Sequence, residues 1–127
     1  MHRLFLDANV LFSASWRKDA GFLRFFRLPD VELITSMYAV EEVLRNLDEP
    51  EVRMRLENLL IRTTIVAEGD PDEVPALLVL NEKDRPILAA AIRARATHLI
   101  TGGRKDFGKL FGRRVRGVRI VRPSEYI

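Results

Sequence analysis

The sequence predicts a single α/β domain in which a parallel sheet of four or five strands is covered by helices on both faces. Its 127 residues fit one domain, spanning 1–127, and hardly two. Apolar residues make up 47% of the chain, which is enough to build a core. Short strand-like runs alternate with helical segments from one end to the other, and this alternation is typical of parallel strands joined by crossover helices.

The first quarter of the chain predicts two strands and two helices. An apolar run at residues 3–6, closed by Asp7, predicts a buried strand. Asn9 can cap a helix over residues 10–16. Residues 20–28 have helical apolar spacing and stop at Pro29; their phenylalanines are interpreted as core or as the face of a homodimer. Residues 31–35 alternate and predict a second strand.

The middle of the chain predicts two helices and a third strand. Ser36 is expected to cap a helix over residues 37–47, whose apolar side chains share one face. Pro50 suits the first turn of another helix that continues to residue 60. The β-branched run at residues 63–67 predicts a strand. Residues 74–80 leave a helix and an extended chain both open.

The last third predicts one helix, two strands and a tail. Residues 83–96 are rich in Ala, Ile and Leu, and predict a helix. Residues 98–101 predict a fourth strand that ends at Gly102 and Gly103. Residues 118–121 predict a fifth strand, followed by a short tail at residues 123–127.

Composition excludes several classes of site. The chain has no cysteine, which excludes disulfides, thiolate metal sites and cysteine nucleophiles, and fits a cytoplasmic location. No run of 18 apolar residues occurs, so we expect no membrane span and no membrane partner. The acid at Asp7 comes too early for a secretory signal.

Charge is distributed unevenly along the chain. Residues 104–127 carry eight Lys or Arg side chains and two acids, a net +6, whereas the whole chain carries +3. A basic segment beside a mildly acidic body indicates a polyanion partner, with a plain solvated surface as an equal alternative. Arg113, Arg114 and Arg116 are the candidate contacts to the phosphate backbone of that partner.

Four acidic residues follow or flank the predicted strands. Asp7 ends the first strand, Asp106 follows the fourth, and Glu42 and Asp84 lie on helices beside the second and fourth. In a parallel sheet such positions can meet at one edge, where facing carboxylates need a cation. Oxygen ligands select Mg²⁺ or Mn²⁺, which can activate water against a phosphodiester. A helix cap and a solvated helix face are the ordinary alternatives for Asp7 and Glu42.

Four segments together resemble the PIN-domain family. They are residues 6–11 (LDANVL), 38–47 (YAVEEVLRNL), 83–91 (KDRPILAAA) and 97–102 (THLITG) continued by Phe107 and Gly108. Their order and spacing fit across nearly the whole chain, down to the closing segment at residues 118–127. One segment alone would be a weak match, whereas four in order are specific.

The resemblance implies a fold, an activity and a set of site residues. It implies a sheet of four or five parallel strands with an acidic metal pocket, and Mg²⁺- or Mn²⁺-dependent cleavage of RNA. Members of this family are often the toxin of a toxin–antitoxin pair of the VapC type. The resemblance therefore also implies an antitoxin protein as partner. The matching acids are Asp7, Glu42 and Asp84, and the matching polar residues beside the pocket are Asn9 and Thr101. Glu42 is preferred to Glu41 because the family's acid is followed closely by Arg, as Glu42 is by Arg45.

The chain departs from the family at the end of the fourth strand. Relatives usually read Thr-Gly-Asp there, whereas this chain reads Thr101-Gly102-Gly103. Gly103 thus takes the place of the fourth acid, and Asp106, three residues later, either folds back as its substitute or points to solvent. The leading hypothesis is a metal-dependent endoribonuclease. The alternative is a PIN-like module that binds RNA or a protein without cutting.

Overall fold

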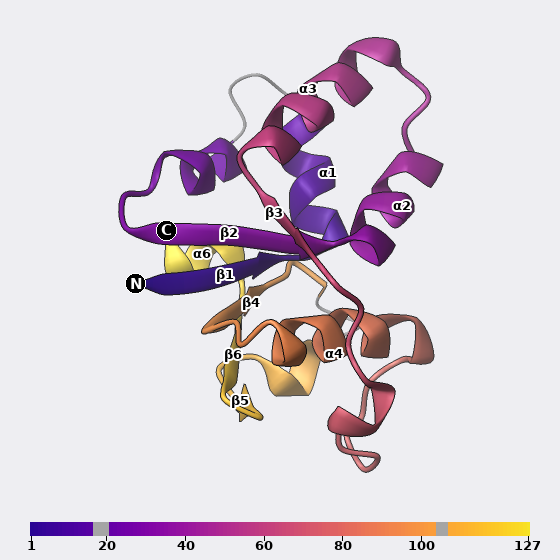
Figure 1. Ribbon diagram of the computed structural model, residues 1–127, viewed down its shortest axis with the longest axis vertical. Coiled ribbons are helices and arrows are strands. Elements are labelled where there is room, and N and C mark those ends of the chain that lie inside the picture. The colour runs from indigo at the N-terminus through magenta and orange to yellow at the C-terminus, as the bar shows by residue number, and fades with distance from the viewer. Residues whose placement is uncertain (17–20, 104–106) are drawn as a thin grey trace.

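The computed structural model describes residues 1–16, 21–103 and 107–127. Within them a six-stranded sheet has the order β3-β2-β1-β4-β6-β5 (Figure 1). The strands are β1 (His2–Leu6), β2 (Val31–Ser36), β3 (Thr64–Val66), β4 (His98–Ile100), β5 (Arg114–Val115) and β6 (Val118–Val121). The strands β1, β2, β3, β4 and β6 pair in parallel, as predicted.

The described sheet has six strands rather than the predicted four or five, and the strand that was not predicted is β5. It pairs antiparallel with β6, and Val115 lies opposite Val118. The two residues between them, Arg116 and Gly117, have φ of 50° and 87°. Positive φ at both central positions is typical of a tight hairpin turn. A strand of two residues is too short to give a sequence pattern, which is why it was not predicted.

Helices cover both faces of the sheet, as predicted. The α-helices are α1 (Ala8–Trp16), α2 (Met37–Arg45), α3 (Pro50–Ile61), α4 (Arg85–Arg93) and α6 (Pro123–Tyr126). Short 3₁₀ turns are η1 (Gly21–Arg27), η2 (Pro71–Glu73), η3 (Glu82–Asp84) and η4 (Gly108–Leu110). Figure 1 shows α1, α2 and α3 on one side of the sheet and α4 on the other.

Two predicted helices differ from the observed ones. Of the helix predicted over residues 20–28, residue 20 lies outside the described residues, and Gly21–Arg27 form the 3₁₀ helix η1 rather than an α-helix. The helix predicted over residues 83–96 begins only at Arg85, because Pro86 lacks an N–H and fits only a first turn. It ends where Arg95 takes a φ of 56°, and Ala96 N donates to Ala91 O at 3.0 Å, which closes the helix terminus. Residues 74–80 form neither helix nor strand.

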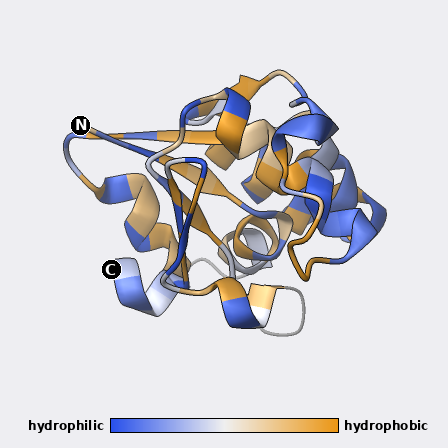
Figure 2. Ribbon diagram, turned by 90° about the horizontal axis from the view of Figure 1, so that it is seen from below, coloured by the Kyte–Doolittle hydropathy of each residue, from blue (hydrophilic) through white to orange (hydrophobic). Residues whose placement is uncertain are grey.

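The central strands form the middle of the core. Leu4, Phe5 and Leu6 of β1 are fully buried, as are Leu99 and Ile100 of β4. The helices in Figure 2 carry both hydrophobic and hydrophilic residues, as expected where one face packs on the core and the other meets water. In the described part of the chain, no helix is long and apolar enough to cross a membrane.

Candidate metal centre

The candidate site lies at the point in the sheet where the chain stops adding strands on one side of β1 and begins adding them on the other. From β1 the chain builds β2 and β3 on one side, and it then returns to add β4 and β6 on the other. The neighbours β1 and β4 are parallel, so their carboxyl ends open onto one crevice, the usual place for a ligand in such sheets. Asp7 follows β1 and Thr101 follows β4 at this edge.

Asp7 is held by hydrogen bonds from three directions. Its side chain is 5% exposed, at the residue before α1. Oδ1 accepts from Ala8 N at 2.7 Å, and Oδ2 accepts from Thr101 Oγ1 at 2.8 Å and from Asn9 Nδ2 at 3.4 Å. The N-terminus of α1 also favours a negative charge there. The carboxylate is therefore oriented by the first residues of α1 and by Thr101, which follows β4.

Thr101 and Asn9 join the two loops at this edge. The fully buried hydroxyl of Thr101 donates to Asp7. It accepts two further hydrogen bonds, from Asn9 Nδ2 and from Gly103 N, both at 3.2 Å. One donated and two accepted bonds use the full capacity of a hydroxyl. Asn9 Oδ1 accepts from Gly102 N at 2.8 Å. The two residues expected to flank the pocket therefore contact Asp7 and fix the loop that contains Gly103.

Asp84 lies at the same edge on the other face of the sheet. The helix α4 runs back toward the start of β4, so its first residues lie near the carboxyl ends of the strands. Asp84 immediately precedes α4 and is 6% exposed. The hydroxyl of Tyr38 donates to the carbonyl of the adjacent Lys83 at 2.7 Å, which ties α2 to this segment.

Glu42 lies one helical turn beyond Tyr38 on α2. It is partly buried, whereas Glu41 is exposed, in keeping with the preference for Glu42. Burial raises the pKa of the Tyr38 phenol, and the charges of Glu42 and Asp84 raise that pKa further. A hollow of about 510 Å³ between α1 and α2 is lined by both Asn9 and Glu42.

The donors at this edge suit a hard cation, although they do not enclose one directly. Within residues 1–16, 21–103 and 107–127, no three acidic or histidine side chains form a group able to hold a metal ion. Asp106 lies outside the described residues. Mg²⁺ usually keeps several waters and is bound through one or two carboxylates. In donor chemistry, the carboxylates of Asp7 and Asp84 therefore suit Mg²⁺ or Mn²⁺.

Solved structures with a similar fold come from toxin–antitoxin systems. No model of a protein family and no curated protein matches the chain. The structure of VapBC2 from Rickettsia felis, bound to a DNA fragment from their promoter, matches with a TM-score of 0.72 and 16% identity over 94% of this chain and 98% of that one. The structure of VapBC-1 from nontypeable Haemophilus influenzae matches with a TM-score of 0.63 and 16% identity over 96% and 98%.

The chain has a VapC-like PIN fold. The match covers nearly all of both chains, so the fold that the four sequence segments indicated is confirmed. Identity of 16% supports the arrangement of helices and strands and does not carry residue roles.

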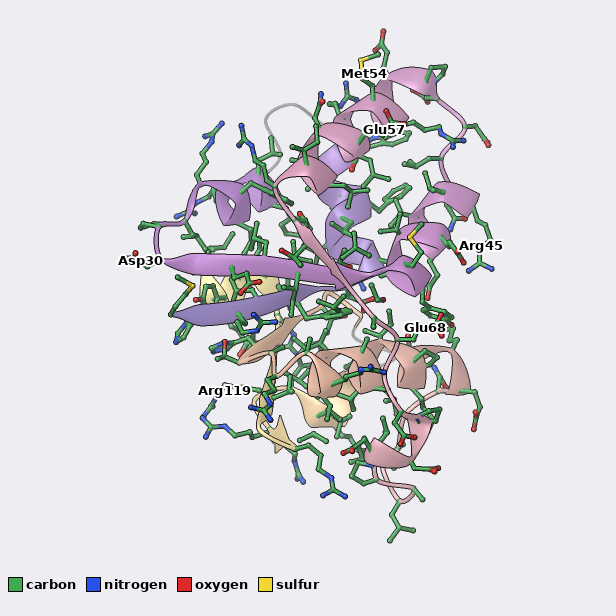
Figure 3. The ribbon with its side chains drawn as sticks, viewed as in Figure 1. Asp30, Arg45, Met54, Glu57, Glu68 and Arg119 are labelled. Atoms are coloured by element: carbon green, nitrogen blue, oxygen red, sulfur yellow. The ribbon has the colours of Figure 1, made fainter. Side chains whose placement is uncertain are left out.

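The candidate phosphate contacts lie away from the acids of the PIN fold. Arg114 is on β5 and Arg116 is in the turn before β6, so this hairpin points to the amino end of the parallel strands. Arg113, Arg114 and Arg116 are all exposed. Arg119, labelled in Figure 3, lies opposite Arg114 on the same hairpin. The structure thus places these arginines at the far edge of the sheet, with β4 and β6 between β5 and the strand that ends at Asp7.

Tyr38 was not predicted as a site residue. It lies in the segment that resembles the PIN family, four residues before Glu42, and residues at this spacing share one helix face. This helical spacing was the signal in the sequence that could have identified Tyr38 as a site residue. The hydrogen bond to Lys83, which gives Tyr38 its place beside Asp84, joins residues 45 positions apart and has no trace in the local sequence.

Proposed function

We propose that the chain is a metal-dependent endoribonuclease that cuts RNA at the edge formed by Asp7, Glu42 and Asp84. The observation that carries this proposal is the buried carboxylate of Asp7, oriented by Thr101 and Asn9 at the crevice between β1 and β4. The VapC-like PIN fold supports it, because VapC proteins are ribonucleases.

Each residue at this edge has a proposed role. Asp7, Glu42 and Asp84 would hold Mg²⁺ or Mn²⁺, which would supply an activated water and stabilise charge on the phosphodiester. Thr101 and Asn9 keep the Asp7 carboxylate directed to the crevice, and Tyr38 fixes the segment that carries Asp84. Asp106 remains a candidate fourth acid.

The test is the substitution Asp7→Asn, which removes the charge and little volume. Cleavage of single-stranded RNA should require Mg²⁺ or Mn²⁺, stop with EDTA and fall at least about 100-fold in the variant, as for loss of a group that acts on the reacting phosphate. Glu41→Gln is the matched control, since Glu41 is exposed on the same helix as Glu42. Cleavage that continues undiminished in EDTA contradicts a metal-dependent mechanism.

A protein antitoxin is the proposed macromolecular partner. The similar structures are VapBC assemblies, and this supports a partner encoded beside the present chain. Co-expression with the neighbouring small reading frame should suppress RNA cleavage and yield a stable complex on gel filtration. If the two products elute separately and cleavage is unchanged, the partner proposal is wrong.

The alternative function is a PIN-like module that binds RNA or a protein without cutting. The observation that favours it is Gly103 in the place of the fourth acid, together with the lack of a three-acid group among the described residues. RNA binding by both wild type and Asp7→Asn, with no Mg²⁺- or Mn²⁺-dependent cleavage by either, would favour the alternative.

A further inference from the structure

We propose that a pocket beside the acidic edge binds one nucleobase, and that it prefers guanine. The pocket lies between α2, the segment after β3 and the first turn of α4, and its volume is about 330 Å³. This volume falls in the range of small-molecule sites. The statement that the base belongs to RNA rests on the proposed function, whereas the affinity for the base can be tested without it.

The walls of this pocket are fixed by hydrogen bonds from side chains to backbone. Tyr38 donates to Lys83 O at 2.7 Å, and Arg85 Nη2 donates to Pro75 O at 2.9 Å. Arg93 Nη1 donates to Glu68 O at 3.0 Å and holds the opposite wall against α4. A pocket already held in shape loses little freedom when it takes up a ligand.

Close backbone packing adds to this preformed shape. Gly69 lines the pocket and rests on α4 so closely that a Cβ there would lie 2.0 Å from Ala89 O. The segment after β3 is therefore pressed onto the helix, and the pocket opens above this contact. Figure 3 labels Glu68, which precedes Gly69, near the start of α4.

The pocket adjoins the proposed site of cleavage. Glu82 and Arg85 line it and bracket Asp84 in the sequence. Tyr38 also lines it, and its hydroxyl donates to the carbonyl of Lys83, the neighbour of Asp84. An occupant would therefore lie next to the segment that carries Asp84, where a base beside the cleaved phosphate has to be placed.

The lining selects a neutral, flat ligand that donates hydrogen bonds. Tyr38, Pro71 and Pro86 offer ring faces, and aromatic faces stack on single-stranded bases. The charged side chains of the lining are Glu68, Glu82 and Arg85, a net charge of −1, which disfavours phosphate in the pocket. Carboxylates only accept hydrogen bonds.

Guanine is the base that best satisfies such acceptors. Its pairing edge presents two adjacent donors, N1–H and the N2 amino group, which one carboxylate can accept together. Adenine and cytosine each present one amino donor beside an acceptor, and uracil presents one N–H between two carbonyls. The pocket has two carboxylates, and the hydroxyl of Ser36 in its lining is fully buried and caps α2 by accepting from Ala39 N. The carboxylates are therefore the main acceptors that a base meets, and they favour guanine.

In the experiment, the full-length Asp7→Asn variant is titrated with GMP, AMP, CMP and UMP. Binding is measured by calorimetry and by NMR chemical shifts. GMP should bind most tightly. Adding Tyr38→Ala should weaken GMP binding roughly tenfold through lost stacking, and Tyr38→Phe should keep most of it. Adding Glu68→Gln or Glu82→Gln should reduce the preference for GMP over UMP. Glu41→Gln is the matched control and should change nothing.

The outcomes separate this proposal from the proposed function. Equal binding of GMP and UMP, or GMP binding that is unchanged by Tyr38→Ala and by Glu82→Gln, overturns the pocket. Binding of N-acetylarginine amide in place of GMP also overturns it, in favour of a cationic peptide. Metal-dependent cleavage without GMP binding refutes only the pocket. GMP binding that shows the expected substitution effects, without any cleavage by wild type, supports the pocket and refutes only the nuclease.

Discussion

The geometry of the acidic edge depends most on one residue, Thr101, whose hydroxyl is buried. It is the only group among the described residues that bonds to Asp7, Asn9 and Gly103 together. It therefore couples the first acid to the loop in which the chain departs from the PIN pattern. Loss of this hydroxyl should disturb both the orientation of Asp7 and the position of that loop.

Thr101→Val tests this coupling, because it replaces the hydroxyl with a methyl group at nearly constant volume. The variant leaves Asp7 Oδ2 without its shortest donor and removes an acceptor from Gly103, so unfolding free energy should fall by about 1–3 kcal/mol. Mn²⁺ affinity should fall as well. Thr101→Ser keeps the hydroxyl and should keep Mn²⁺ affinity. Urea denaturation and Mn²⁺ titration measure both, and equal Mn²⁺ affinity in the two variants would show that the hydroxyl does not position Asp7.

His98 predicts a dependence of stability on pH. Burial lowers its pKa, and the nearby charges of His2, Arg119 and Arg114 lower it further. The folded chain then binds this proton less readily than the unfolded chain, whose histidine has a pKa near 6.5. The contribution of His98 to the free energy of unfolding is therefore fully present above about pH 6.5, and it decreases as the pH falls below that value. Between pH 7.5 and 5.5, unfolding free energy should fall more in wild type than in His98→Gln, and parallel curves would contradict the prediction.

At the level of helices and strands, the sequence predicted the existence of elements better than their ends. The apolar runs of β1 and β4 are local signals, and so is the Ser36 cap, whose Oγ accepts from Ala39 N. The end of a helix depends on single residues such as Pro86, and a hairpin as short as β5 depends on pairing with β6. Tertiary partners decide such features, and the local pattern does not contain them.

The same limit applies to the candidate site. The positions of Asp7 and Thr101 could be predicted from strand ends, because parallel strands end at a common edge. The orientation of their side chains could not, since it depends on bonds across 94 residues of sequence. Whether the acids form a direct metal cluster likewise depends on distances that no spacing along the chain determines.

The contact between the segment after β3 and α4 predicts a strict requirement for glycine. A Cβ at Gly69 would lie 2.0 Å from Ala89 O and 2.7 Å from Ala90 N, both backbone atoms of a helix. Gly69→Ala must therefore displace the segment, and unfolding free energy should fall by roughly 1–3 kcal/mol, as for other overpacked sites. Gly108→Ala is the control, because nothing lies within 4 Å of its Cβ position. Thermal unfolding measures both, and an equal effect of the two substitutions would contradict the close contact.

Over the whole molecule, the acids and the hairpin arginines belong to different strands of the sheet. Asp7 and Thr101 follow the carboxyl ends of β1 and β4, whereas the β5–β6 turn at Arg116 and Gly117 precedes the amino end of β6. Three inter-strand spacings separate β1 from β5, about 14 Å at about 4.8 Å for each spacing. A nucleic acid that contacts both must therefore extend across the strands of the sheet.

This separation makes the effect of the arginines depend on the length of the RNA. Replacing Arg113, Arg114 and Arg116 with Ala should weaken binding of a long single-stranded RNA and flatten its salt dependence, because fewer counterions are released. A dinucleotide bound at the acids cannot reach the hairpin, so its cleavage should be unchanged. Fluorescence anisotropy over a range of salt concentrations, beside cleavage of both substrates, measures the two effects.

The control for this prediction removes the same charge from another surface. Arg24, Arg27 and Arg53 are exposed and lie outside the hairpin, on η1 and α3. Their replacement with Ala lowers net charge equally, so any loss of binding it causes measures the general field of the protein. A hairpin that guides RNA should lose more affinity and more salt dependence than this control. Equal losses in the two triple variants would mean that the hairpin arginines act only through net charge, and that RNA approaches the acidic edge by another path.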